Sequence, residues 1–296
     1  MDWAKKGEEL YNQYVRPYGS VTREISLINS FNVSVRGSKP ITLTEYQEEA
    51  LFHLHNGKNV VVYKTRQCGY TTLMLLHMIY ILDIEFCTNN YHCVSDILYV
   101  APNGAMREEA KNKLKEIVQS CTLGNSEGFL KEALKHITFM TYDRVDMLCS
   151  RRFDYAFYDE FAFADVQDFE NFVHCAYATM LSDREPKHHL PPVGTSLFAS
   201  SFSNENEERA KKAVEKMLSN NAVIMETHWY EVPTLNKNLV WKKYEVEPTI
   251  DKEGNVRYDK ERWTKKIAEG WIPTSPKFEK LCETLGEEKA KIELLN

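Results

Sequence analysis

The sequence comprises 296 residues, 43% hydrophobic and 27% charged, which is enough to build a sizeable core without disulfide staples. Its net charge of -6 excludes a protein that binds polyanions through its overall field, so any DNA contact requires local basic patches. The seven cysteines are scattered without a paired C-x-x-C spacing, which excludes a disulfide framework and predicts reduced thiols.

The N-terminal part of the chain, residues 2–36, is predicted to form a short helix and a polar connection, and Pro40 marks a boundary. Residues 44–47 match the capping-box pattern, which predicts the start of a helix. The uninterrupted apolar run at 60–63 is typical of a strand that is covered on both faces of a parallel sheet. A loop and an apolar helix over 71–82 follow.

The same alternation continues along the chain. A basic-faced amphipathic helix is predicted over 106–118, and a Lys/Arg-rich helix after residue 206. Further strands are predicted at 97–101, 137–140, 155–158, 196–201 and 223–226. Strands that alternate with helices indicate an α/β fold with a mostly parallel sheet flanked by helices.

The C-terminal region differs in pattern. A hairpin tip is predicted at 251–255, between strands at 244–246 and 256–258. A charged helix is predicted from Pro276 to Asn296, interrupted at Gly286. The acidic residues of this helix are spaced to pair with lysines, which favours solvated helix faces over a metal centre.

The longest apolar run, 73–82, is about half of the ~20 residues that a membrane-spanning helix needs, so a core helix and no membrane association are expected. The N-terminal residues lack the apolar segment of a signal peptide, and secretion is not expected. Cys87, His92 and Cys93 lack a second close ligand pair, so ordinary thiols are favoured over a zinc site.

A candidate phosphate-binding loop lies between the strand at 60–63 and the helix at 71–82. Against the pattern G-x-x-x-x-G-K-[ST], Gly69 and Thr71 match, whereas Lys64 replaces the first glycine and Tyr70 replaces the lysine. The loop needs backbone N–H groups, a cation for the phosphates and a hydroxyl for Mg²⁺. Lys64 can supply the cation, with Arg66 as a second one. The alternative is a plain strand-to-helix turn. The predicted nucleotide-binding residues of the loop are Lys64, Thr65, Arg66, Gln67, Cys68, Gly69, Tyr70, Thr71 and Thr72.

Two adjacent carboxylates, Asp159 and Glu160, follow the apolar strand at 155–158. The carboxyl ends of strands are where open α/β sheets bind ligands. Asp159 is suited to hold Mg²⁺ with Thr71, and Glu160 to orient or deprotonate the attacking water. A solvated acidic turn is the alternative, but this pair together with the loop favours a nucleotide site.

Four features in this order carry a resemblance to a known family. They are Tyr46-Gln47 before the first strand, Arg-Gln-x-Gly-x-Thr over 66–71, the apolar Asp-Glu strand, and a strand that ends in hydroxyl residues before Asn204. Over about residues 40–235 the chain resembles the ATPase domain of the large terminase subunit of tailed phages, the motor that pumps DNA into proheads. The linking subdomain of that family resembles the region after residue 235.

The resemblance implies roles for individual residues. Tyr46 and Gln47 would contact adenine, Lys64 would stand in for the usual loop lysine, and Arg66 would stabilise transition-state charge in cis. Ser200, Ser201 and Asn204 would sense the γ-phosphate and couple its loss to the DNA-gripping surface.

The resemblance also implies a fold, cofactors and partners. It implies a P-loop NTPase fold of the ASCE/RecA-like kind, with an N-terminal appendage (1–39), an ATPase core (40–235) and a small linker subdomain (236–296). The cofactors would be ATP and Mg²⁺. The partners would be double-stranded DNA, the portal protein and the small terminase subunit, with a homo-oligomeric ring on the portal. The chain would act in the cytoplasm of the bacterial host, transiently on the prohead.

The pattern departs from the family after Asp259, where the carboxylates of an RNase H-type nuclease are not found, so no nuclease activity is expected. The basic residues that are candidates for DNA contact are Lys111, Lys113, Lys115, Arg151, Arg152, Lys211 and Lys212, each of which can equally be a solvated surface residue. A helicase-like ATPase and an inactive scaffold of the same fold remain as alternative functions.

Overall fold

The computed structural model describes residues 16–33, 39–87, 94–120, 126–148, 151–180, 189–201, 212, 214–215, 218, 221–243, 246–250 and 266–286. These residues form two compact units. The first falls within residues 1–62, 69–200 and 205–225, and the second within residues 63–68, 201–204 and 226–296. The domain bounds expected from the sequence, 1–39, 40–235 and 236–296, stay a prediction.

A six-stranded sheet has the strand order β5-β4-β6-β7-β3-β8. Strand β4 runs parallel to β5 and β6, and β6 runs parallel to β7. The strands are β3 (Asn59–Lys64), β4 (Ile97–Ala101), β5 (Ile137–Thr141), β6 (Tyr155–Asp159), β7 (Ser196–Ser200) and β8 (Ala222–Thr227). Each lies within one residue of its predicted limits. Strands β3, β4, β6 and β7 are buried along their whole length, as apolar runs predict for strands covered on both faces.

Asn59 connects the first residues of three strands. Its side-chain oxygen accepts hydrogen bonds from the Ser196 backbone N–H (3.0 Å) and hydroxyl (2.7 Å), and its own N–H donates to the Asn221 carbonyl (2.9 Å). Strands β3, β7 and β8 therefore begin at the same edge of the sheet and run in the same direction. The α/β fold class with a mostly parallel sheet is confirmed.

The strand order matters for the candidate site. Strand β7 lies between β3, which leads into the predicted phosphate loop, and β6, which carries Asp159. An additional strand, β7, therefore separates the strand that leads into the loop from the strand that carries Asp159. Because the strands are parallel, their carboxyl ends share one edge of the sheet, where α/β proteins bind their ligands.

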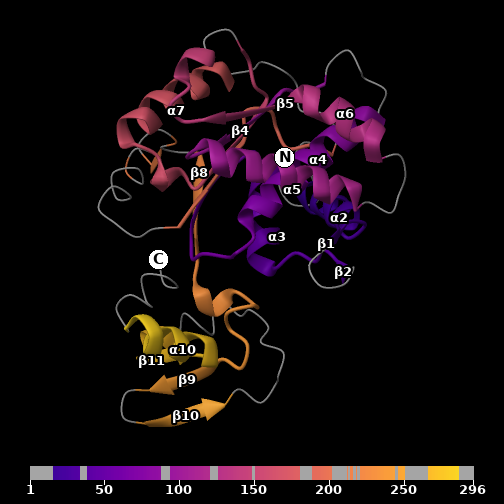
Figure 1. Cartoon of the computed structure of the whole chain (residues 1–296). Coiled ribbons are helices and arrows are strands. Elements are labelled where there is room, and N and C mark those ends of the chain that lie inside the picture. Colours follow the sequence, from indigo (N-terminus) through magenta and orange to yellow (C-terminus); the bar gives the residue numbers. More distant parts are fainter. Residues whose placement is uncertain are drawn as a thin grey trace, which may run out of the picture. The chain divides into compact units, whose positions relative to one another are not determined.

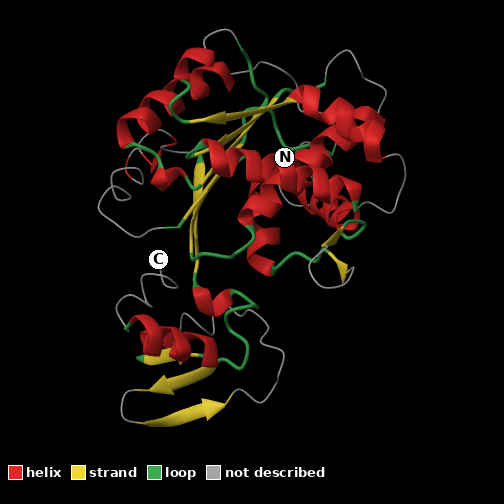
Figure 2. Ribbon diagram, in the orientation of Figure 1, coloured by secondary structure: helices red, strands yellow, loops and turns green. Residues whose placement is uncertain are grey.

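Helices flank the sheet on both sides (Figure 2). They are α2 (Arg16–Ile28), α3 (Glu45–His55), α4 (Tyr70–Cys87), α5 (Gly104–Gln119), α6 (Ser126–His136) and α7 (Val166–Met180). Helices α6 and α7 are not among the predicted elements. The short strands β1 (Asn32–Val33) and β2 (Lys39–Pro40) form a separate antiparallel pair.

Helix α4 is longer than predicted, since it continues past residue 82 to Cys87. Charged residues at 83 and 85 interrupt the apolar run, but Glu85 is buried and accepts hydrogen bonds from the Ser95 N–H (2.8 Å) and hydroxyl (2.7 Å). The helix is long and apolar enough to cross a membrane, yet 72% of it is buried inside the protein. It is apolar on all sides, as helices buried in a core are.

The second unit contains a three-stranded antiparallel sheet in the order β10-β9-β11 with helix α10 (Figure 1). These elements are β9 (Val240–Lys243), β10 (Val246–Ile250), β11 (Trp271–Thr274) and α10 (Pro276–Leu285). Helix α10 begins where predicted, after the N-cap Ser275, whose hydroxyl accepts the Phe278 N–H at 3.1 Å. Trp229 stacks on Phe278 with ring centroids 4.9 Å apart.

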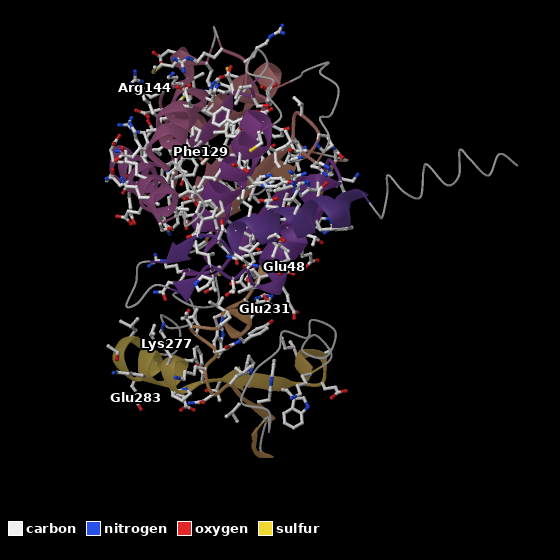
Figure 3. The ribbon with its side chains drawn as sticks, turned by 90° about the vertical axis from the view of Figure 1, so that its right-hand side faces the viewer. Glu48, Phe129, Arg144, Glu231, Lys277 and Glu283 are labelled. Atoms are coloured by element: carbon white, nitrogen blue, oxygen red, sulfur yellow. The ribbon has the colours of Figure 1, made fainter. Side chains whose placement is uncertain are left out.

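The predicted hairpin tip at 251–255 lies outside the described residues. In the described part of the chain, the antiparallel partner of β10 is β9, and only residues 244–245 separate the two strands. Helix α10 ends before Gly286, as predicted. Lys277 and Glu283 lie on α10 (Figure 3), and both are exposed, which fits a solvated helix face.

Candidate nucleotide site

The predicted phosphate loop joins the end of β3 at Lys64 to the first residue of α4 at Tyr70. Two loop residues have positive φ, Gln67 (66°) and Gly69 (77°). The positive φ of Gly69 favours glycine there, and a Cβ atom at this position would lie 2.8 Å from Nε2 of Gln47, the end of a flexible side chain. The loop therefore makes a tight turn immediately before the N-terminus of a helix, which is where backbone N–H groups can bind phosphate.

The first two residues of the loop are buried and the next two are exposed. Lys64 is only 4% exposed and Thr65 is buried, whereas Arg66 and Gln67 are exposed. The thiol of Cys68 donates a hydrogen bond to the Thr65 carbonyl at 2.8 Å, which closes the turn. The two cations predicted to act on phosphate thus differ, since Lys64 ends a buried strand and Arg66 faces solvent.

Tyr70 occupies the position of the usual loop lysine. It is 1% exposed, its ring centroid lies 5.8 Å from that of Tyr46, and its hydroxyl lies 3.5 Å from the Tyr46 carbonyl oxygen. Tyr70 is therefore part of the core, and the cation of the loop has to come from another residue.

Tyr46 and Gln47, the predicted adenine contacts, lie on α3 beside the loop. Tyr46 is buried. The side-chain oxygen of Gln47 accepts the Thr44 N–H at 3.0 Å, as the predicted capping box requires, and its nitrogen faces Gly69. The structure thus places both residues next to Gly69 and Tyr70, and their contact with adenine stays a prediction.

The Thr71 hydroxyl and the Asp159 carboxylate form the centre of the site. Thr71 Oγ1 donates a hydrogen bond to Asp159 Oδ2 at 2.7 Å, and Asp159 is 3% exposed. A hydroxyl and a carboxylate are oxygen ligands of the kind that Mg²⁺ prefers. The two predicted magnesium ligands are brought together, and they fit the ion chemically. Thr72, the next residue of the helix, is half-buried.

Two tyrosines that the sequence analysis does not single out contact Asp159. The Tyr99 hydroxyl donates to Asp159 Oδ2 at 2.6 Å, and the Tyr142 hydroxyl donates to the Asp159 carbonyl oxygen at 3.3 Å. Burial, followed by the Asp159 charge, raises the pKa of both tyrosines well above the usual value, so both keep their protons. Both tyrosines lie in apolar stretches of the sequence, where a tyrosine is expected to be a core aromatic. No local pattern therefore marks them as contacts of Asp159.

Glu160 leaves the strand in a left-handed conformation, with φ 46° and ψ 45°. This conformation is uncommon for a residue with a side chain and recurs at functional sites. The Glu160 N–H donates to the Ala199 carbonyl at 2.7 Å. The Ser200 hydroxyl lies 3.4 Å from Glu160 Oε2 and accepts the Ala162 N–H at 3.1 Å. The predicted coupling strand therefore reaches the predicted catalytic carboxylate.

The remaining predicted residues are placed less completely. Ser201 is buried at the end of β7, and Asn204 lies outside the described residues. Cys87 is exposed, and its predicted neighbours His92 and Cys93 also lie outside the described residues.

The candidate DNA-contacting residues differ in exposure. Arg151, Arg152 and Lys212 are exposed, Lys111 and Lys115 are half-buried, and Lys211 lies outside the described residues. Lys113 on α5 is also half-buried. Burial lowers its pKa, and the charge of Asp159 acts in the opposite direction. Lys113 therefore adds positive potential on the side of Asp159.

No protein-family model matches the chain, and no curated protein matches it. Among solved structures, the chain is similar to a hypothetical ATP-dependent RNA helicase from Sulfolobus tokodaii (16% identity, TM-score 0.42), covering 70% of this chain and 56% of that one. It is similar to the UvsW helicase from bacteriophage T4 (11% identity, TM-score 0.46), covering 74% of this chain and 71% of that one. It is also similar to a DEAD box protein from Methanococcus jannaschii (12% identity, TM-score 0.45), covering 74% of this chain and 55% of that one. The chain thus spans about half the length of two of these three proteins. The α/β fold of the chain is shown by the order and direction of its own strands.

Proposed function

We propose that the chain is a Mg²⁺-dependent ATPase. The observation that carries this proposal is the hydrogen bond between Thr71 in the first turn of α4 and Asp159 at the end of β6. A glycine-containing loop before a helix N-terminus, joined to an acidic strand end, combines phosphate-binding backbone amides with magnesium ligands. Gly69 supplies the left-handed conformation with which this loop turns into α4.

Each residue then has a role in phosphoryl transfer. Backbone N–H groups of the loop and of the first turn of α4 bind the phosphates. Thr71 and Asp159 would hold Mg²⁺, which neutralises charge on the phosphate oxygens when bound. Glu160 orients and deprotonates the water, and the Ser200 hydroxyl keeps the carboxylate in place. Lys64 supplies the cation that Tyr70 cannot.

The test is steady-state ATP hydrolysis by the purified chain, with and without Mg²⁺. Glu160→Gln should lower the rate about 10²- to 10⁴-fold. Glu127→Gln, at an exposed position on α6, is the matched control and should hydrolyse at the wild-type rate. Absence of hydrolysis in the wild-type chain under all nucleic-acid conditions would favour an inactive scaffold of the same fold.

The finer proposal is a motor that drives double-stranded DNA into a viral prohead, as the terminase resemblance implies. It is supported by the contact between Ser200 on the coupling strand and Glu160, because this contact offers a path from hydrolysis to a neighbouring strand. The motor would form a homo-oligomeric ring on the portal, receive DNA from the small terminase subunit, and act in the bacterial host cytoplasm.

Two assays separate this motor from a helicase-like ATPase. Packaging of duplex DNA into proheads, dependent on ATP and abolished by Glu160→Gln, would support the terminase proposal. Strand separation by the chain alone, without portal or prohead, would support the helicase-like alternative and contradict packaging as the activity.

A further inference from the structure

Three buried side chains that are not among the candidate nucleotide residues meet at one point. Glu24 lies on α2, His55 ends α3, and His77 lies in the middle of α4. Glu24 Oε2 lies 2.8 Å from His55 Nε2, and Glu24 Oε1 lies 2.7 Å from His77 Nδ1. The side chains are 0%, 1% and 1% exposed. Helix α2 packs on α3 and on α4, and the labels of the three helices lie near one another in Figure 1. Each helix thus contributes one polar group to a single buried cluster.

Glu24 is a fully buried carboxylate that lies between two buried imidazole rings. A buried carboxylate that faces two imidazoles needs a positive charge to balance it, and a divalent cation supplies that charge without protonating either ring.

Aromatic rings surround the cluster and hold the imidazoles in place. The His55 and His77 centroids are 5.7 Å apart, Tyr80 lies 5.8 Å from His55, and Phe157 lies 5.8 Å from His77. The outer nitrogens, His55 Nδ1 and His77 Nε2, have no hydrogen-bond partner within the described ranges. One nitrogen of each ring therefore faces the Glu24 carboxylate, and the other nitrogen of each ring is buried.

The geometry is close to that of a metal centre. One ligand atom from each of the three residues lies within 4.8 Å of the others. An ion about 2.0–2.2 Å from each ligand in tetrahedral geometry separates them by about 3.3 Å, so the nitrogens have to move outward by roughly half an ångström. Two imidazoles and one carboxylate form a ligand set that suits zinc and similar transition metals and does not suit Mg²⁺ or Ca²⁺, which prefer oxygen.

We propose that Glu24, His55 and His77 bind one transition-metal dication of the zinc class, with water as the fourth ligand, and that this ion fastens α2 to α3 and α4. The site is independent of the proposed ATPase. It also differs from the Cys87, His92 and Cys93 grouping considered in the sequence, because its ligands are 31 and 53 residues apart and carry no spacing motif.

The experiment measures metal content by mass spectrometry after the full chain is incubated with Zn²⁺ and desalted. The wild type should retain about one zinc ion per chain, and zinc should raise its melting temperature. His55→Gln and His77→Gln should retain less than about a tenth of this and lose the thermal shift. His53→Gln, on the same helix but outside the cluster, is the matched control and should bind as the wild type does.

X-ray absorption of zinc bound to the wild-type chain keeps the test decisive if a variant fails to fold. Scattering from two imidazoles and oxygen supports the proposal, whereas sulfur scattering would place the metal at cysteines and overturn it. A folded wild-type chain that retains no zinc, cobalt or iron would also overturn it and leave a purely hydrogen-bonded triad.

Discussion

Thr71 and Asp159 are 88 residues apart in the chain, yet the hydroxyl of one lies 2.7 Å from the carboxylate of the other. The contact joins the start of α4 to the end of β6 across the carboxyl edge of a parallel sheet. It brings together the two residues that the sequence offers as magnesium ligands. Asp159 Oδ2 also accepts from Tyr99, so the position of the carboxylate is set by two donors.

Exchange of Thr71 for valine tests this contact directly. Valine keeps the shape and removes the hydroxyl, so we expect ATP hydrolysis to fall at least about tenfold and the Mg²⁺ requirement to rise. A titration of rate against Mg²⁺ measures both. Thr138→Val, on β5 outside the site, is the control and should leave the Mg²⁺ requirement unchanged. A wild-type Mg²⁺ titration for Thr71→Val would refute Thr71 as a ligand.

Tyr99 is expected to position Asp159 without touching the substrate. Tyr99→Phe should cost about 1 kcal/mol of unfolding free energy, as the loss of one hydrogen bond does. It should also raise the Mg²⁺ concentration for half-maximal hydrolysis about tenfold. Tyr155→Phe removes a similar buried hydrogen bond, 2.8 Å to the Pro191 carbonyl, away from the site. If both variants lose stability and neither changes the Mg²⁺ dependence, Tyr99 is purely structural.

Gly69→Ala should destabilise the protein by about 1–3 kcal/mol, since position 69 has a φ of 77° and its Cβ would meet Gln47 at 2.8 Å. Nucleotide affinity should fall together with the stability, because the loop has to change its backbone conformation to accept alanine. Gly104→Ala is the control, for its Cβ would meet nothing within 4 Å and helix α5 accepts alanine. Denaturant unfolding and nucleotide titration measure the two effects. Equal stability of both variants would contradict the argument.

Lys64→Met tests the replacement of the usual loop lysine. Methionine preserves the buried stem of the side chain and removes the charge, so we expect a folded protein with strongly reduced ATP binding and hydrolysis. Lys58→Met, one residue before β3, is the control. Normal hydrolysis by Lys64→Met would show that another residue, such as Arg66, supplies the cation.

Local patterns predict much of this protein. Apolar runs indicate the strands because both faces of the sheet are covered, and Gly69 marks the turn because few residues adopt its conformation. The acidic pair at the end of β6 is recognised as a candidate site because the carboxyl ends of parallel strands meet at one edge of the sheet, where ligands bind. In contrast, the acidic residues within α4 obscure the end of that helix, since the partner of Glu85 is Ser95, which lies beyond the helix end.

The amino-acid sequence alone therefore specifies the six strands of the main sheet, the loop and the acidic pair, since each depends on neighbouring residues. The tertiary structure decides the contacts that depend on strand order and helix packing. It brings Tyr99 to Asp159, turns Glu160 toward Ser200 and buries Tyr70 in the core. It also joins Glu24 to two histidines on other helices. Such contacts span tens of residues, and no local propensity encodes them.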